Sequence, residues 1–144
     1  MPAIAYSTNI VPNVLRRGDK IRIKGILNDN AQEFSINFVN EICKNPDFIT
    51  YHFKWILDEH VIVENYKDNG SWVDHQEQDY DSLDGPIFDL EFTFQDGVID
   101  VYKFFDNKPN RITTYEPYFE ISEIKALQVW GDVKKISELT FKYA

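Results

Sequence analysis

Six side chains between residues 52 and 77 have the chemistry to hold a ligand rich in hydroxyl groups. A tryptophan offers a flat apolar ring that can stack on the C–H face of a sugar. Histidine and asparagine can exchange hydrogen bonds with hydroxyls, and lysine and glutamate can orient a polar ligand. These side chains are His52, Lys54, Asn65, Trp72, His75 and Glu77.

Three of these candidates also have ordinary structural explanations. Trp72 can be a core residue, since tryptophan is highly buried on average. His52 can be a solvated histidine on the surface of a strand. Asn65 can end a strand in a turn, as asparagine often does. The residue types alone leave both explanations open.

No group of residues indicates catalysis or a metal site. No serine, cysteine or lysine of this chain lies in a sequence motif that activates a nucleophile. His52, His60 and His75 lack the spacing of metal ligands, and a single cysteine argues against structural zinc. We therefore expect a protein that is not an enzyme, with no catalytic residue, no metal and no cofactor.

Length and composition favour one soluble β-rich domain over residues 1–144. Phenylalanine, tyrosine and tryptophan make up 15% of the chain, and these residues prefer strands. The net charge of −9 argues against nucleic acid or an anionic membrane as the main partner. Cys43 has no second cysteine to pair with, so we expect a reducing compartment and a buried thiol.

The chain shows no membrane-spanning segment and no signal peptide. Residues 1–13 lack the charged start and the apolar centre of a secretion signal. We expect no membrane insertion and a cytoplasmic location, with secretion by a route that uses no signal peptide as the alternative. Asn69-Gly70-Ser71 matches a glycosylation acceptor, but we interpret it as an Asn-Gly turn.

Short segments of alternating apolar and polar residues, separated by turn residues, predict ten strands. Only residues 39–44 and 119–127 have room for a helical turn. A single domain with this many strands is a β-sandwich or a barrel. The predicted strands are 21–27, 33–39, 49–57, 61–66, 71–78, 87–94, 98–105, 111–115, 125–130 and 136–143.

Alternation also assigns side chains to the two faces of each strand. In residues 49–57 the odd positions are apolar and should face the core, as should the phenylalanines and leucine of 87–94. The even positions of 49–57 and the odd positions of 33–39 then share an outer face. That face should gather Ser35, Asn37, His52 and Lys54 into a polar platform for a ligand.

The order and spacing of several motifs resemble a galectin carbohydrate-recognition domain along nearly the whole chain. The opening segment is similar to I-P-G-x-L followed by G-x-x-I-x-I-x-G, and residues 34–38 resemble R-F-x-I-N-L. Later elements resemble F-D-L and I-x-G-D-V. The matching residues are Val11-Pro12, Leu15, Gly18, Ile21 to Gly25, Phe34 to Phe38, Phe88 to Leu90 and Val129 to Val133.

The resemblance implies a jelly-roll β-sandwich of two antiparallel sheets that binds β-galactosides on its concave face. The family's contact pattern is H-x-N-P-R, then V-x-N, then W-x-x-E-x-R. His52, Asn65 and Trp72 match it. Four contact positions differ, and Trp55 also replaces the proline. The differing contacts are Lys54 for Asn, Ile56 for Arg, His75 for Glu and Glu77 for Arg.

These replacements should weaken ordinary lactose binding. Ile56 cannot donate the hydrogen bonds that an arginine makes, and each lost bond costs roughly 0.5–1.5 kcal/mol. Two or three losses would weaken binding by roughly a hundredfold. Lys54, His75 and Glu77 can form a different polar set, with Glu33 adding negative charge. If His75 contacts the ligand, affinity should change between about pH 5.5 and 7.5.

Two functions therefore follow from the resemblance. The first is a lectin with weak or non-standard galactoside specificity that binds glycans or glycoconjugates. The alternative is a galectin fold that has lost sugar binding and acts through protein contacts, for which outward-facing Ile56 is an anchor. By the same analogy a homodimer can form through residues 20–27 or 136–143.

Overall fold

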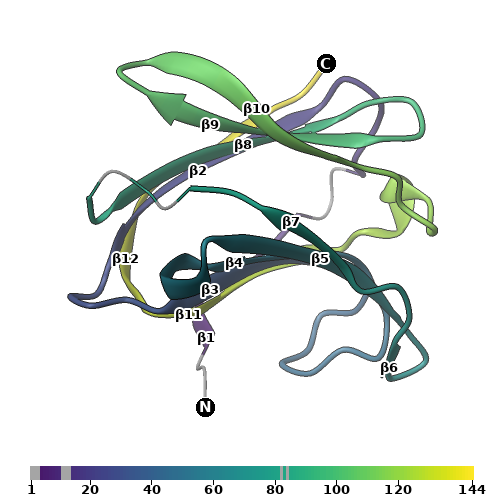
Figure 1. Cartoon of the computed structure of the whole chain (residues 1–144). Coiled ribbons are helices and arrows are strands. Elements are labelled where there is room, and N and C mark those ends of the chain that lie inside the picture. The colour runs from purple at the N-terminus through teal and green to yellow at the C-terminus, as the bar shows by residue number, and fades with distance from the viewer. Residues whose placement is uncertain (1–3, 11–13, 82, 84) are drawn as a thin grey trace.

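Two antiparallel sheets stack face to face in the computed structural model, which describes residues 4–10, 14–81, 83 and 85–144 (Figure 1). Val11-Pro12 of the opening motif lies outside the described residues. The larger sheet has seven strands and the smaller sheet five. The predicted all-β sandwich of two antiparallel sheets is confirmed.

The larger sheet carries the side chains of interest, and its strands run in the order β1-β11-β3-β4-β5-β6, with β7 also paired to β5. Strands β6 and β7 meet the same partner at opposite ends, β6 at Lys67 and Asp68 and β7 at residues 61–64. The bounds are β1 Ile4–Asn9, β3 Glu33–Val39, β4 Ile49–Ile56, β5 Val61–Asp68, β6 Ser71–Trp72, β7 Gln76–Asp79 and β11 Ala126–Gly131.

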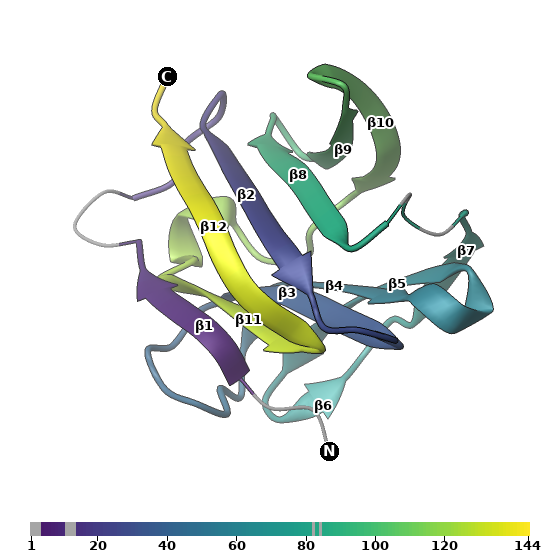
Figure 2. The same cartoon turned by 90° about the vertical axis from the view of Figure 1, so that its left-hand side faces the viewer.

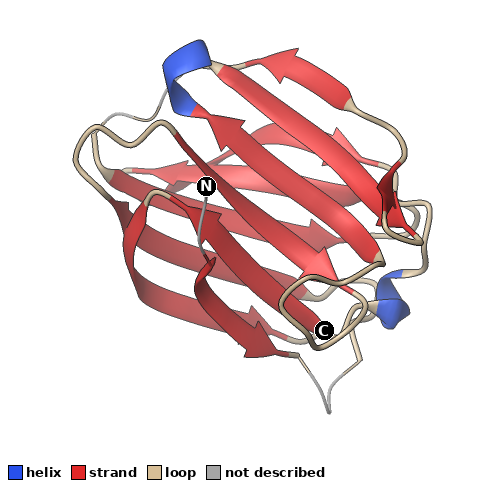
Figure 3. Ribbon diagram, turned by 90° about the horizontal axis from the view of Figure 1, so that it is seen from below, coloured by secondary structure: helices blue, strands red, loops and turns tan. Residues whose placement is uncertain are grey.

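The smaller sheet covers the inner face of the larger one, in the order β10-β9-β8-β2-β12 (Figure 2). Helical structure in the described residues is limited to the short turns η1, Leu57–Glu59, and η2, Ile121–Glu123 (Figure 3). No described helix is long enough or apolar enough to cross a membrane. The strands are β2 Lys20–Leu27, β8 Ile87–Phe94, β9 Ile99–Phe105, β10 Lys108–Tyr115 and β12 Val133–Lys142.

Aromatic rings from both sheets interlock in the core between them. Phe34 stacks on Phe88 with ring centroids 4.7 Å apart, and Phe38 meets Phe92 edge to face at 4.9 Å. Most side chains predicted to face inward lie in this core, including Trp55 at 0% exposure, whereas Ile49 is buried in a separate cluster with Val39 and Ala126. This burial fixes the register, because a shift by one residue would turn His52 into the core and Trp55 into water.

The strand prediction differs from the structure by one to three residues at the ends of several strands and, more substantially, at two places. Strand β1 was not predicted, because its residues are only alternately half-buried at the edge of the sheet and give a weak pattern. The predicted strand 71–78 is interrupted at residues 73–75, which leaves β6 and β7 as separate pieces. Of the two predicted helical turns, η2 falls within 119–127, whereas Val39 ends β3 and residues 40–44 contain bends only.

Two smaller predictions are settled by strand pairing and exposure. Dimerisation through residues 20–27 is wrong, because β2 is already hydrogen-bonded to β8 on one side and β12 on the other. Residues 136–143 fall mostly in edge strand β12, so dimerisation there stays a prediction. Cys43 is exposed in the loop before β4, which corrects the expected buried thiol.

Candidate functional site

A groove lies on the outer face of the larger sheet, the face turned away from the core. Strands β3, β4, β5 and β11 form its floor, while the loop between β3 and β4 and strand β6 project from this face and flank it (Figure 1). Two adjoining hollows make up the groove, and they share His52, Lys54 and Trp72. The predicted polar platform of Ser35, Asn37, His52 and Lys54 is therefore present.

His52 forms the centre of the floor and is held in one orientation. Its Nδ1 lies 2.6 Å from Oδ1 of Asn37 on the neighbouring strand. An amide oxygen can only accept, so Nδ1 carries the proton and Nε2 is left as an acceptor. Burial, followed by the nearby charges of Lys54, Lys67 and His75, lowers the pKa of His52 to about 3. The imidazole is therefore neutral at physiological pH.

The lowered pKa predicts a pH-dependent stability. The unfolded chain binds a proton at His52 near pH 6.5, whereas the folded chain does not until about pH 3. The contribution of neutral His52 to the free energy of unfolding is therefore complete above pH 6.5 and is lost as the pH falls toward 3. When the pH falls from 6.5 to 4.5, the free energy of unfolding of the unmodified protein should decrease by about 2 kcal/mol more than that of the His52→Gln variant. Urea unfolding of both proteins across this range measures the difference.

The comparison isolates His52 because both proteins keep their other titrating groups. Buried Glu64 has a raised pKa, mainly from desolvation, and acts with the opposite sign: its folded form takes up protons more readily as pH falls. That contribution is common to both proteins and cancels. If the free energy of unfolding changes with pH by the same amount in the two proteins, the imidazole of His52 is not held neutral in the folded protein.

Trp72 stands at the edge of the groove with 47% of its surface exposed, so it is not a core residue. Its ring centroid lies 4.6 Å from that of His52, at a tilt of 44°. The Nζ of Lys67 lies 4.8 Å from the indole centroid, a cation–π contact. The Asn69-Gly70 turn creates this pairing, because both residues have positive φ and place Lys67 directly opposite Trp72.

Lys54 points into the groove and pairs with Glu33 rather than with Glu77. Its Nζ lies 2.8 Å from Oε2 of Glu33, and both side chains are about one-third exposed. An ion pair this exposed is worth at most about 1 kcal/mol, so a ligand can displace it. Its present effect is to cancel the negative charge that Glu33 was expected to bring to the groove.

His75 and Glu77 lie together beyond Trp72, as their shared parity predicted. Nε2 of His75 is 3.1 Å from Oε1 of Glu77, and both side chains are more than half exposed. Glu77 belongs to β7, whereas His75 lies in the interruption between β6 and β7. The pair forms one wall of the second hollow, together with Ile56, Val63 and Val73.

Asn65 is buried below Trp72 and braces the interrupted strand. Its Oδ1 accepts hydrogen bonds from the backbone N–H groups of Tyr66 and Asp74, both at 2.8 Å. The amide oxygen is thus used within the protein, and the NH₂ group remains to face a ligand. This differs from the expectation that Asn65 both donates to and accepts from the same ligand.

Sequence analysis did not identify several groove residues. Trp130 and Gln128 line the groove from β11, and Lys44 lines it from the β3–β4 loop. Nε1 of Trp130 donates to Oε1 of Gln128 at 3.0 Å, and Nε2 of Gln128 donates to the Cys43 carbonyl at 2.7 Å. Alternation along residues 125–130 could have placed both β11 residues on this face; the loop residues carry no such signal.

The described residues contain no group of three or more His, Cys, Asp or Glu side chains that could hold a metal. The charged and aromatic side chains of the groove are instead suited to hydroxyl-rich or polar ligands. A β-sandwich with a polar, tryptophan-edged groove on one sheet is the architecture of a domain that binds such ligands without chemical change.

Comparison with known proteins identifies the family. The family model for galactoside-binding lectins matches residues 5–141, and the chain belongs to this family, the galectins. Galactose-binding lectin l-1 of the eel Anguilla japonica is 21% identical over 127 residues, covering 86% of this chain and 87% of that protein.

Solved galectin structures share the fold. An Arg-to-Asn variant of human galectin-16 superimposes with a TM-score of 0.79 at 23% identity, covering 99% of this chain and 97% of its own. Sheep galectin-11 gives a TM-score of 0.77 at 20% identity, covering 96% of this chain and 97% of its own. At identities this low, the superpositions show a common fold and no more than that.

Proposed function

We propose that the protein binds carbohydrate in this groove and that its preference differs from that for simple β-galactosides. One observation carries the proposal: a half-exposed indole stands beside a fixed, neutral imidazole at the edge of the groove. The eel relative is named for galactose binding, which supports a sugar as the class of ligand.

Each groove residue has a definite role in this proposal. The C–H face of a sugar ring stacks on Trp72, and its hydroxyls donate to Nε2 of His52 or accept from the NH₂ group of Asn65. Lys54, His75 and Glu77 contact further hydroxyls and set selectivity. Because His52 is neutral from pH 5 upward, its imidazole does not contribute a pH dependence of affinity above that value.

The altered preference follows from Ile56. This residue faces the groove at the end of β4, opposite Glu33 on β3, and offers no donor where the family pattern has arginine. A galactoside therefore loses a charged, forked donor, which is worth about 1.5–3 kcal/mol. A ligand that draws its affinity from stacking and from the lysines does not depend on that position.

A second function, binding to a protein partner, is favoured by the apolar side of the groove. Val73 is 50% exposed next to Trp72, and Ile56 opens into the same hollow. An apolar spot within a polar rim can anchor a side chain of another protein. Under this alternative Trp72 contributes to a protein interface and glycans do not compete for it.

The three tryptophans allow a direct test by nuclear magnetic resonance. Trp55 is fully buried, Trp130 is hydrogen-bonded on the far side of the groove, and Trp72 is half-exposed. Titration with galactose-, mannose- and N-acetylglucosamine-terminated oligosaccharides should shift the indole N–H signal of Trp72 and leave that of Trp55 unchanged. A glycan that binds without moving the Trp72 signal, or no response to any glycan, would contradict the proposal.

A further inference from the structure

The groove carries positive charge on a protein that is acidic as a whole. The chain has 24 acidic and 15 basic residues, yet three lysines line the groove: Lys44, Lys54 and Lys67. The carboxylates that line it, Glu33 and Glu77, are bonded to Lys54 and His75 respectively. Within the described part of the chain, neither Lys44 nor Lys67 has a carboxylate within ion-pair distance, so both are available to an anion.

The electrostatic environment of His52 supports the same picture. After burial, the influences that lower its pKa to about 3 are the positive charges of Lys54 and Lys67 and the nearby His75. A cationic field at the centre of the floor disfavours a further positive charge and favours a negative one. The charges that act on His52 are therefore positive, opposite in sign to the net charge of −9.

The side chain of Lys67 is held beside Trp72, and the backbone of Lys44 is anchored next to the groove. The two-residue turn at Asn69-Gly70 sets Lys67 beside Trp72, where its Nζ stays 4.8 Å from the ring centroid. The Lys44 backbone is anchored because its carbonyl accepts from Nε2 of Gln128 at 3.3 Å. Lys44 and Lys67 line the same hollow as Trp72, so an anion bound there would lie near a ring stacked on the indole.

We propose that the groove selects glycans that bear an anionic substituent, a sulfate ester or a carboxylated sugar, bound by Lys67 and Lys44 next to the ring that stacks on Trp72. This inference rests on the proposed carbohydrate-binding function and narrows its substrate class. It also explains how a groove without the family's arginine can retain useful affinity, because a charged partner strengthens each remaining hydrogen bond.

Calorimetric titration with three sugars tests the inference: lactose, sulfated lactose and lactose extended by sialic acid. At low ionic strength at least one charged sugar should bind about tenfold or more tightly than lactose, and the advantage should shrink toward about 0.15 M salt. Comparison of the two charged sugars distinguishes a sulfate from a carboxylate as the preferred group.

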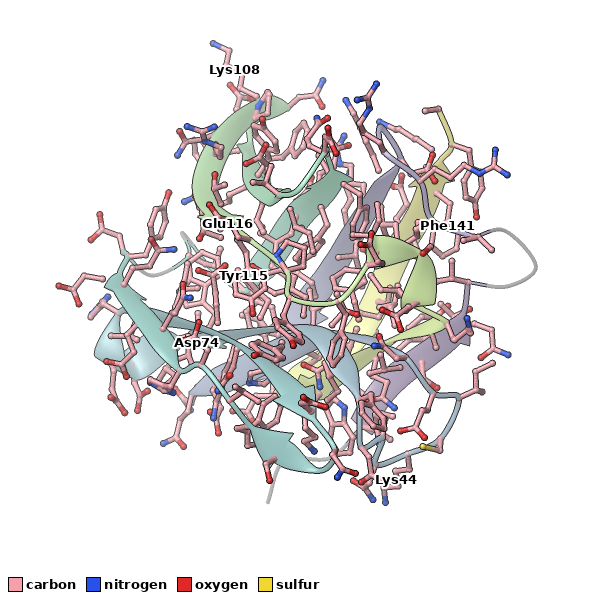
Figure 4. All side chains as sticks on the ribbon, turned by 90° about the vertical axis from the view of Figure 1, so that its right-hand side faces the viewer. Lys44, Asp74, Lys108, Tyr115, Glu116 and Phe141 are labelled. Atoms are coloured by element: carbon pink, nitrogen blue, oxygen red, sulfur yellow. The ribbon has the colours of Figure 1, made fainter. Side chains whose placement is uncertain are left out.

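Lysine variants locate the effect. Lys67→Gln and Lys44→Gln should each weaken binding of the preferred charged sugar by roughly three- to tenfold, a larger loss than either variant causes for lactose. The matched control is Lys108→Gln, an exposed lysine on β10 that lies at the opposite end of the molecule from Lys44 (Figure 4). This control should bind all three sugars like the unmodified protein.

The outcomes separate this inference from the proposed function. Equal affinity for charged and neutral sugars, lost in Trp72→Ala, would overturn the anionic preference and leave a carbohydrate-binding groove. Inorganic sulfate that binds as tightly as sulfated lactose, whether or not Trp72 is present, would overturn both, because the groove would then be a simple anion site. Failure of all three sugars to bind at millimolar concentration would overturn the anionic preference, while the titration with mannose- and N-acetylglucosamine-terminated oligosaccharides would decide the proposed function.

Discussion

Replacing Ile56 by arginine should raise the affinity for lactose by roughly ten- to a hundredfold. Ile56 ends β4 on the same face as His52 and Lys54, and its side chain opens into the hollow that Glu77 also lines. The introduced guanidinium would supply a rigid fork of donors to sugar hydroxyls. A carboxylate can hold it in place, because Glu33 is the residue paired with Ile56 on β3.

Two control variants at the same position separate geometry from charge. Ile56→Lys adds a positive charge without the fork and should give a smaller gain, while Ile56→Ala removes the apolar side chain and should give none. Calorimetric titration of lactose into all three variants measures the differences. If Ile56→Arg binds lactose no better than Ile56→Ala, the loss of the arginine is not what alters the specificity of the groove.

Much of the fold could be predicted because alternation is strong wherever a strand has one buried face. In β4 the inward residues Tyr51, Phe53 and Trp55 are completely buried, and this alone places His52 and Lys54 in the groove. Strand β1 lacked such a signal, since none of its residues is fully buried and partly exposed residues alternate with exposed ones. A strand is therefore easier to predict from sequence when one of its faces is buried and the other is exposed.

The groove could be predicted only in part, because contacts between strands decide how its side chains are used. Sequence placed Lys54 on the correct face but could not show that Glu33 is its partner, or that two backbone groups occupy the Asn65 oxygen. Lys67 was within reach of prediction: an Asn-Gly hairpin turn pairs the residues two positions away on either side, Lys67 and Trp72. Lys44 lies in an irregular loop, where periodicity gives no information.

Trp55 shows how a departure from a family motif can be structural. It stands where the family pattern has proline, and it packs in the core against Phe34, Phe53 and Tyr80. Its Nε1 is buried without a hydrogen-bond partner among the described residues, which costs about 1–3 kcal/mol of stability. The substitution therefore affects the core, while the adjacent outward positions, Lys54 and Ile56, affect the groove.

Loss of the indole in Trp72→Ala is the second large effect we expect, and it bears directly on carbohydrate binding. Removal of the stacking ring should weaken binding of the preferred glycan by at least about tenfold, because stacking and the buried area of the ring are lost together. The fold should tolerate the change, since Trp72 is half-exposed on the two-residue strand β6. Phe105→Ala is the matched control, since it removes a ring that is 63% exposed on the other sheet.

A broad glycan array probed with the unmodified protein, Trp72→Ala and Phe105→Ala is the measurement that tests this account most directly. We predict binding to a defined class of glycans that is lost in Trp72→Ala and kept in Phe105→Ala, with equal unfolding midpoints for all three proteins. No binding anywhere on the array, or binding that survives in Trp72→Ala, would contradict a carbohydrate site in the groove. Protein partners of the apolar side formed by Ile56 and Val73 would then be the ligands to seek.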